Sequence, residues 1–265
     1  MTTQTQKLRL EFSHQGTVAR LILSAPKANV IDVEMLDELD RSMDVIEERT
    51  GLKAIVLTAE GPHFSFGASI EEHLPDAIES TLQRLHSTLR HLNALPAPTI
   101  AAVHGQCLGG GLELVLACDL ILAENTAHLS CPEITLGVIA PAASVLLPLR
   151  IRGGDAVHFL LTGASWSAEE ALGKGLVDRI APEGQLAATL DDWLEKDFVS
   201  RSSVGLHYAS HAVRSPRTRV LENDLPHLER LYLEGLMSSP DGSEGIRAFL
   251  EKRAPAYREG VADES

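Results

Sequence analysis

Segments typical of buried strands alternate with segments typical of helices through the first part of this chain, and this alternation restricts the folds it can adopt. Residues 53–58 and 99–103 are short runs of apolar and β-branched residues, the pattern of strands buried on both faces. The apolar positions of residues 32–49 instead recur at helical spacing, and Asp32 is suited to cap that helix. This alternation predicts an α/β fold of stacked or wound units. Strands over residues 8–12 and 17–24 are predicted to form a hairpin around the turn at Gln15 and Gly16, and a further strand is predicted over residues 120–122. Further helices are predicted over residues 76–95 and 112–117.

The strand pattern ends near Gly184, and the remainder of the chain is predicted to be helical. We place the change near residue 200, which gives an α/β core over residues 1–200 and a C-terminal helical domain over residues 201–265. The apolar faces of these helices, with Leu225 and Leu228 as examples, must pack on the core or on another subunit. The helices are predicted over residues 186–200, 203–213, 221–237 and 244–252.

Composition excludes several classes of function. The formal net charge of −14 repels nucleic acid and anionic membrane surfaces, although a local cluster of Lys and Arg can still bind an anionic ligand. Residues 1–6 are polar and no long apolar run follows, so we expect neither a signal peptide nor a membrane span. The three cysteines have no CxxC spacing, which indicates buried, reduced thiols in a cytoplasmic protein.

A triple glycine, Gly109 to Gly111, lies between the predicted strand 99–103 and the predicted helix, and Glu113 follows it. The spacing is neither that of a dinucleotide-binding fingerprint nor that of a P-loop. Glu113 can simply complement the helix dipole in a tight turn. Alternatively, bare backbone N–H groups at such a turn can bind a developing negative charge, and three adjacent glycines are costly unless a ligand approaches the backbone.

A second glycine-containing loop covers residues 61–69, and a second carboxylate, Glu133, occurs in the sequence Cys-Pro-Glu-Ile. Taken alone, the loop can be an ordinary connection and Glu133 an exposed side chain. Taken with the triple glycine, two loops can each supply one N–H donor to a thioester oxygen. Two carboxylates near that point can carry out both proton transfers of an addition or elimination.

Other candidate sites are weaker. His207 and His211 are four residues apart, but Tyr208 occupies the position where the metal-binding HExxH pattern requires Glu. We therefore expect no metal site there. Arg214, Arg217 and Arg219 are interpreted as a solvated linker and not as a nucleic-acid patch. A G-x-S-x-G nucleophile motif is absent from the sequence, which argues against a serine hydrolase.

Several segments together resemble the enoyl-CoA hydratase/isomerase (crotonase) superfamily over nearly the whole chain. The resemblance implies an α/β spiral of ββα units with a C-terminal helical domain that mediates oligomerisation and CoA contact. It also implies trimers or hexamers, an acyl-CoA substrate, and no separate cofactor, since CoA is part of the substrate. The matching segments are residues 25–30 (APKANV), 55–58 (IVLT), 64–69 (FSFGAS), 109–113 (GGGLE), 117–119 (ACD), 132–134 (PEI) and 248–253 (AFLEKR).

The resemblance also implies roles for individual residues. Glu113 and Glu133 match the two catalytic glutamates of the hydratases, and the backbone N–H groups of Ala68 and Gly110 match the oxyanion hole. The presence of both glutamates favours a hydratase over a dehalogenase or thioesterase. Which glutamate is the acid and which the base stays open at this point. Contact with the substrate or its CoA part is implied for Lys27, Ala28, Ser69, Ile70, Phe249 and Lys252.

The chain departs from ordinary β-oxidation hydratases at two places. Ser69 replaces the Asp of their usual G-A-D loop, and residues 140–144 read APAAS where they typically carry P-G-x-G-G. Ala140 and Pro141 are therefore expected to reshape the acyl pocket. With these features the chain most resembles the cyclohexa-1,5-dienecarbonyl-CoA hydratases of anaerobic benzoyl-CoA degradation.

That resemblance implies hydration of a cyclic conjugated dienoyl-CoA to 6-hydroxycyclohex-1-ene-1-carbonyl-CoA. A general short-chain enoyl-CoA hydratase is the nearest alternative. A non-catalytic RNA-binding or scaffold protein on the same fold is an alternative of another class.

Overall fold

The structure is a computed structural model, and it describes residues 6–25, 28–74 and 77–257. Strands of these residues form a larger sheet in the order β1-β2-β3-β4-β6-β9 and a smaller one in the order β5-β7-β8. Strands β1 and β2 form the predicted antiparallel hairpin, while the other neighbours in the larger sheet are parallel. Parallel neighbours need crossover connections, and the predicted alternation of strands and helices supplies them. The larger sheet contains β1 (Leu8–Ser13), β2 (Val18–Leu23), β3 (Ala54–Ala59), β4 (Thr99–Val103), β6 (Leu120–Glu124) and β9 (Arg179–Ala181), and the smaller sheet β5 (Gln106–Leu108), β7 (His128–Ser130) and β8 (Ser165–Ser167).

The smaller sheet brings together two turns that matter for function. Strands β5 and β7 are parallel neighbours, so their carboxyl ends meet at one edge. The N–H of Gly109, just after β5, donates to the carbonyl of Ser130 at the end of β7 (2.9 Å). Strands β5, β7, β8 and β9 are not predicted from the sequence, because three-residue strands are too short to show alternation.

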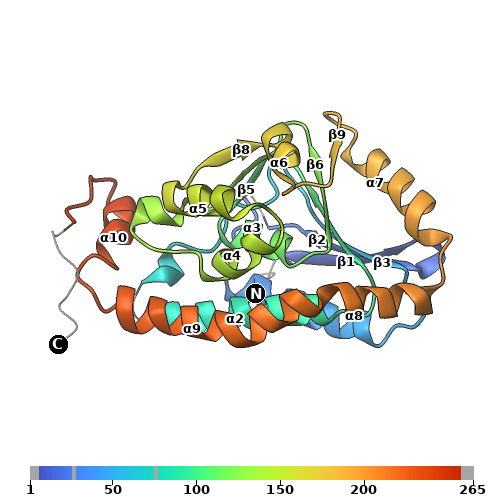
Figure 1. Cartoon of the computed structure of the whole chain (residues 1–265), viewed down its shortest axis with the longest axis horizontal. Coiled ribbons are helices and arrows are strands. Elements are labelled where there is room, and N and C mark those ends of the chain that lie inside the picture. Colours follow the sequence, from blue (N-terminus) through green and yellow to red (C-terminus); the bar gives the residue numbers. More distant parts are fainter. Residues whose placement is uncertain (1–5, 26–27, 75–76, 258–265) are drawn as a thin grey trace, which may run out of the picture.

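Helices cover the sheets (Figure 1), and those predicted over residues 32–49, 76–95 and 112–117 are present, whereas the three helices between residues 141 and 174 are not predicted. Asp32 caps α1 as expected, since its carboxylate accepts a hydrogen bond from the N–H of Met35 (2.9 Å). The helix predicted over residues 112–117 begins two residues earlier, at Gly110. The helices of this part are α1 (Val33–Glu47), α2 (Ile78–Ala94), α3 (Gly110–Leu116), α4 (Pro141–Leu146), α5 (Gly153–Thr162) and α6 (Ala168–Lys174).

The C-terminal region is helical, as predicted. Helices α8 and α9 lie along the same side of the molecule as α2, and α10 lies at one end (Figure 1). Three π-helical turns extend these helices, one of them joining α8 to α9, and each holds more residues per turn than the α-helix next to it. The helices are α7 (Leu186–Leu194), α8 (Ser203–Arg219), α9 (Leu225–Arg230) and α10 (Glu244–Leu250), and the π-helical turns are Glu195–Val199, Val220–Asp224 and Leu231–Leu236.

The C-terminal helices share a hydrophobic core with the α/β part. Leu221 and Leu225 are fully buried in the same cluster as Met35 of α1 and Leu112 of α3. This packing fixes the C-terminal helices against the elements that carry the glycine turn. The division of the chain near residue 200 stays a prediction.

The interpretation of Arg214 and Arg217 as part of a solvated linker is wrong. Both lie in α8, which continues to Arg219, and their guanidinium groups bind the carboxylate of Asp119 (2.6 Å each). Arg214 also donates to three main-chain carbonyls near the start of β4. Burial raises the pKa of Asp119, but the hydrogen bonds and charges of the two arginines outweigh it and hold that pKa at about 2. The arginines therefore tie α8 to the core.

Cys107, Cys118 and Cys131 are free and buried, as predicted. Burial raises the pKa of each thiol, which keeps it protonated and unreactive. Within the described part of the chain, no helix combines the length and hydropathy that crossing a membrane requires.

Candidate active site

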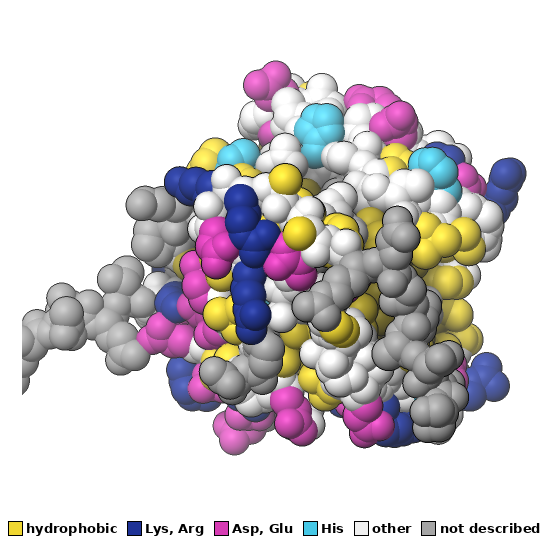
Figure 2. Space-filling view, turned by 90° about the vertical axis from the view of Figure 1, so that its left-hand side faces the viewer, with side chains coloured by type: hydrophobic (Ala, Val, Ile, Leu, Met, Phe, Trp, Pro, Cys, Tyr) yellow, Lys and Arg dark blue, Asp and Glu magenta, His cyan; other side chains and the backbone are white. Residues whose placement is uncertain are grey.

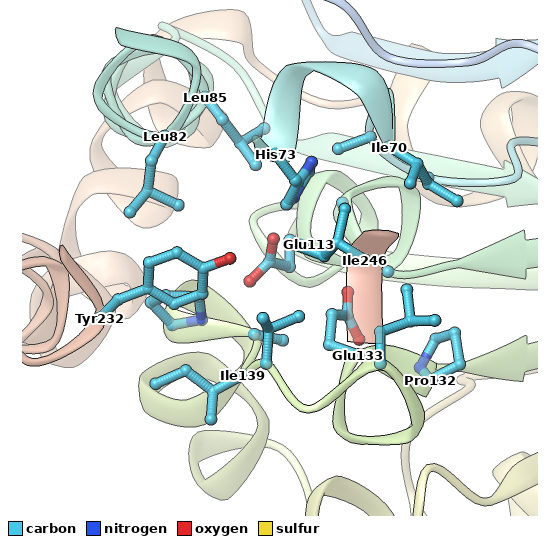
Figure 3. Close-up of a pocket in the computed structure, with 18 of the residues that line it drawn as sticks. Ile70, His73, Leu82, Leu85, Glu113, Pro132, Glu133, Ile139, Tyr232 and Ile246 are labelled. Atoms are coloured by element: carbon cyan, nitrogen blue, oxygen red, sulfur yellow. The ribbon is translucent and has the colours of Figure 1, made fainter. Parts of the chain in front are cut away.

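A cavity of about 100 Å³ lies between the glycine turn, the loop of residues 66–70 and the C-terminal helices. Glu113 and Glu133 both line it, together with the backbone of Gly109 and Gly110 (Figure 3). Most of the remaining lining is apolar, so charge inside the cavity is poorly solvated. The apolar lining comes from Phe66, Ile70, Leu82, Leu85, Leu136, Val138, Ile139, Ala140, Pro141 and Ile246, among others.

The backbone of Gly109 makes room for Glu133. Its φ of 48° and ψ of −124° fall in a region that essentially only glycine adopts. A methyl group on this Cα would lie 2.5 Å from Oε1 of Glu133. Glycine is therefore required at this position both by the conformation of the turn and by the close carboxylate.

The amides of Ala68 and Gly110 lie close together and face the cavity. A Cβ atom added to Gly110 would lie 3.3 Å from the nitrogen of Ala68. Ala68 pairs with Ile31 in a parallel β-bridge. The hydrogen bonds of this bridge join Ile31 to the flanking residues Gly67 and Ser69, so the N–H of Ala68 points away from Ile31. Gly110 is the first residue of α3, where an N–H has no partner inside the helix. Neither amide donates to another described residue.

Glu113 is held at the start of α3 and is only 3% exposed. Its Oε1 accepts a hydrogen bond from the N–H of Ala143 (2.9 Å), in the first turn of α4. Its carboxylate also lies near the positive end of α3. The fixed carboxylate is thus stabilised by a helix on each side.

Glu133 has a different environment. It lies in the 3₁₀-helix Pro132–Leu136, and its Oε2 atom is buried and has no hydrogen-bond partner among the described residues. Burial, and secondarily the negative charge of Glu113, raises the pKa of Glu133 to about 8. Glu133 is therefore mainly protonated at neutral pH.

Two polar side chains in the cavity were not found from the sequence. Tyr232, from the π-helical turn Leu231–Leu236, is 1% exposed, and its hydroxyl has no partner among the described residues. His73 lines the cavity as well, and its Nδ1 donates to the carbonyl of Ser69 (2.7 Å), leaving Nε2 without a proton in the neutral ring. Neither residue belongs to a recognisable motif, and the π-helical turn shifts the register on which a prediction for Tyr232 would depend.

The expected acyl-pocket residues, Ala140 and Pro141, do line the cavity, at the start of α4. Pro141 occupies the first helical position, where its missing N–H costs nothing. The departure at residues 140–144 therefore lies in the cavity wall and also supplies the N–H that binds Glu113.

The expected CoA-contacting residues are dispersed. Ile70 lines the cavity, and Ser69 is buried beside it, with its hydroxyl donating to Glu71. Ala28 is half-buried and accepts a hydrogen bond from the N–H of Phe66, next to the loop that carries Ala68. Lys27 lies outside the described residues.

Phe249 and Lys252, also expected to contact CoA, lie at the α10 end of the molecule. Both are exposed, and neither lines the cavity. That end carries hydrophobic patches with Lys and Arg as well as Asp and Glu side chains (Figure 2). Despite the net charge of −14, this face is therefore not uniformly acidic. The roles of these residues stay predictions.

Among the described residues, the side chains close enough to share a metal ion are Asp44, Glu47 and His91, on α1 and α2. The two carboxylates are exposed, and His91 also contacts Asp40. None of these four lines the cavity.

Comparison with known proteins gives consistent matches over the chain. The family model described as enoyl-CoA hydratase/isomerase matches residues 13–260. A cyclohexa-1,5-dienecarbonyl-CoA hydratase of Thauera aromatica is 39% identical over 254 residues, covering 96% of this chain and 98% of that protein. A probable enoyl-CoA hydratase of Bacillus subtilis (strain 168) is 34% identical over 246 residues, covering 91% and 95%.

A solved structure agrees with these matches. The crystal structure of an enoyl-CoA hydratase/isomerase from Pseudoalteromonas atlantica T6c superimposes with a TM-score of 0.84 at 25% identity, covering 95% of this chain and 100% of that one. The α/β fold with a helical C-terminal region, expected from the sequence, is thereby confirmed.

Proposed function

Because the chain belongs to the enoyl-CoA hydratase/isomerase family and has its crotonase fold, we propose that it adds water to a cyclic conjugated dienoyl-CoA thioester. At the coarser level it is an enzyme of the enoyl-CoA hydratase type, a hydro-lyase. The proposed reaction converts cyclohexa-1,5-diene-1-carbonyl-CoA to 6-hydroxycyclohex-1-ene-1-carbonyl-CoA. The observation that carries the proposal is that the buried Glu113 and Glu133, whose Oε2 atom is buried, both line a small apolar cavity beside two free amides.

The amides of Ala68 and Gly110 would hold the thioester oxygen. Water attacks the β-carbon of the conjugated thioester, and an electron pair moves through the conjugated system to that oxygen. Two N–H donors fixed in a poorly solvated cavity stabilise the resulting enolate. Removing one such donor from comparable sites raises the barrier by about 3–4 kcal/mol.

The two glutamates would divide the proton transfers. Glu113, whose carboxylate accepts the Ala143 N–H, takes a proton from the attacking water. Glu133, held protonated by burial and by the charge of Glu113, gives its proton to carbon. In a cyclic diene that carbon is the far end of the conjugated system, so the remaining double bond moves within the ring. A proton must then leave Glu113 and another return to Glu133 before the next turnover.

The size of the cavity favours a compact acyl group. Its volume of about 100 Å³ is of the same order as that of an apolar cavity, about 150 Å³, known to admit benzene. Ala140 and Pro141 line the cavity and belong to the segment 140–144, which stands where β-oxidation hydratases typically carry a glycine-rich stretch. The similarity to the Thauera aromatica hydratase points to the same ring.

The substrate is tested by offering the purified protein cyclohexa-1,5-diene-1-carbonyl-CoA and crotonyl-CoA separately and following water addition. We expect a higher kcat/KM for the cyclic diene. A clear preference for crotonyl-CoA would instead assign a general short-chain enoyl-CoA hydratase. Specific binding of RNA, together with no turnover of either thioester, would support the non-catalytic alternative.

We also propose that the protein acts in the cytoplasm as a trimer or hexamer and needs no cofactor besides the CoA of its substrate. The support for self-association is the exposure of apolar side chains on the C-terminal helices, where Val204, Val213 and Leu231 are at least 52% exposed. Light scattering coupled to size-exclusion chromatography measures the mass directly. A monomer under assay conditions would refute this part of the proposal.

A further inference from the structure

The hydroxyl of Tyr232 is a polar group without an evident structural purpose. The side chain is 1% exposed, and the hydroxyl finds no hydrogen-bond partner among the described residues. A buried hydroxyl left unpaired destabilises the folded chain, and phenylalanine would fill the same space without that cost. A ligand that provides the missing partner would account for the tyrosine.

The direction of the side chain identifies where that partner lies. Tyr232 extends from the C-terminal helices into the cavity, and its hydroxyl is directed toward the carboxylate of Glu113 (Figure 3). Burial, followed by the charges of Glu133 and Glu113, raises the pKa of Tyr232, so the hydroxyl keeps its proton and remains a donor. It makes no direct hydrogen bond to either glutamate. An oxygen atom between Tyr232 and Glu113 would satisfy both groups, because water and alcohols both donate and accept.

We propose that Tyr232 is a further substrate-contacting residue, whose hydroxyl donates a hydrogen bond to the oxygen atom that is added to the acyl group. That atom belongs to water before the addition and to the hydroxyl group of the product afterwards. This inference rests on the proposed function, since it assumes that water is activated by Glu113. Tyr232 transfers no proton: it orients the lone pair of the water toward the β-carbon while Glu113 accepts the proton.

The test compares Tyr232→Phe with Tyr208→Phe, which removes a hydroxyl from a 70% exposed side chain of α8. Binding is measured for the product 6-hydroxycyclohex-1-ene-1-carbonyl-CoA and for cyclohex-1-ene-1-carbonyl-CoA, which lacks the hydroxyl. Tyr232→Phe should weaken binding of the product by roughly tenfold, the effect of one lost hydrogen bond, and leave binding of the deoxy compound unchanged. The kcat/KM for hydration should fall by at least ~10-fold, while Tyr208→Phe changes neither quantity.

Thermal unfolding separates this role from packing. Because Tyr232→Phe keeps the aromatic ring and removes an unpaired hydroxyl, its Tm should equal or exceed that of the unmodified chain. A lower Tm with equal weakening of both ligands would indicate a packing role and overturn the proposal. An unchanged preference for the hydroxylated ligand would overturn it too, whatever the turnover.

The role of Tyr232 can be tested independently of the proposed substrate. If the unmodified protein hydrates crotonyl-CoA but not the cyclic diene, the proposed substrate is wrong. The ligand pair then becomes 3-hydroxybutyryl-CoA and butyryl-CoA, which differ in the same hydroxyl. Loss of the preference for the hydroxylated member in Tyr232→Phe would still support the role of Tyr232, and its retention would refute it.

Discussion

The backbone N–H of Ala143 donates a 2.9 Å hydrogen bond to Oε1 of Glu113. This bond joins the first turn of α4 to the first turn of α3, so the segment that distinguishes this chain from ordinary hydratases also positions one of its proposed catalytic carboxylates. A change of sequence in residues 140–144 therefore acts on the wall of the acyl pocket and on the proposed base together.

Replacing either glutamate by glutamine should abolish most hydration. Each substitution removes one proton transfer, and such groups contribute about 10²–10⁴-fold to rate. Glu113→Gln keeps an oxygen for the Ala143 N–H, so the fold should be retained. The measurement is kcat with the cyclic dienoyl-CoA, with calorimetric binding of the deoxy compound as the control for folding. Full turnover in either variant would contradict the proposed roles.

Hydration should decline at alkaline pH. Glu133 must be protonated to act as an acid, and its pKa of about 8 means that kcat/KM falls as pH rises through that value. Because negative charge on Glu113 contributes to this shift, Glu113→Gln should lower the pKa of Glu133, which carboxyl ¹³C NMR can measure. A rate that stays constant from about pH 7 to about pH 9 would exclude Glu133 as the acid.

The same shift affects stability. The folded-state pKa of Glu133 lies above its ordinary value of 4.5. At pH values between the ordinary and the folded-state pKa, the folded chain therefore holds a proton that the unfolded chain has lost. The free energy of unfolding should therefore decrease as pH rises across this interval. Glu133→Gln should remove this part of the decrease in denaturant titrations, and an identical pH dependence in both proteins would be the contrary result.

Gly109→Ala should displace Glu133 and destabilise the turn. The new methyl group would meet Oε1 at 2.5 Å, and the φ of 48° is unfavourable for any other residue, at a cost of about 1–3 kcal/mol. Activity should fall by at least ~100-fold because the proposed acid moves. Gly173→Ala in α6 is the matched control: no atom lies within 4 Å of its added methyl group. It should leave activity unchanged and stabilise the protein by about 0.5–1 kcal/mol.

Arg214→Ala should destabilise the protein without touching the cavity. It leaves the largely buried carboxylate of Asp119 with Arg217 as its remaining arginine partner, beside the hydrogen bonds from Thr99, and breaking a buried ion pair costs about 3–5 kcal/mol. The pKa of Asp119 is about 2, below its ordinary value of 3.8. The stability that this carboxylate adds to the fold is therefore present above pH 3.8 and is lost as the pH falls toward about 2. Acid unfolding should therefore begin at a higher pH in the variant. The exposed Arg219→Ala serves as the control in circular dichroism, and equal effects of the two changes would contradict this account.

The sequence predicts those parts of the molecule that depend on local pattern. The hairpin, α1 with its Asp32 cap, and the glycine turn before Glu113 all follow from residues close together in the chain. The three-residue strands cannot be predicted in this way, because their pairing comes from tertiary contacts. The burial of Arg214 cannot be predicted either, since only the folded chain brings Arg214 to Asp119.

The residues of the candidate site also differ in whether the sequence predicts them. Glu113 and Gly110 belong to one local motif, and the family resemblance adds Ala68 and Glu133. Tyr232 belongs to neither, because its place in the cavity depends on the docking of a distant helix and on a π-helical turn. Residues that reach a site through such packing carry no local signal in a single sequence.

The π-helical turn at Leu231–Leu236 has a consequence for how acyl preference can diverge. A π-turn arises when one residue is inserted into an α-helix, and loss of one residue before Tyr232 would rotate the residues that follow by about 100° relative to α9. A single insertion or deletion near this turn therefore changes which side chain faces Glu113, while both glutamates and both glycine loops stay as they are. Relatives with identical motifs can then differ in substrate through the length of one C-terminal helix.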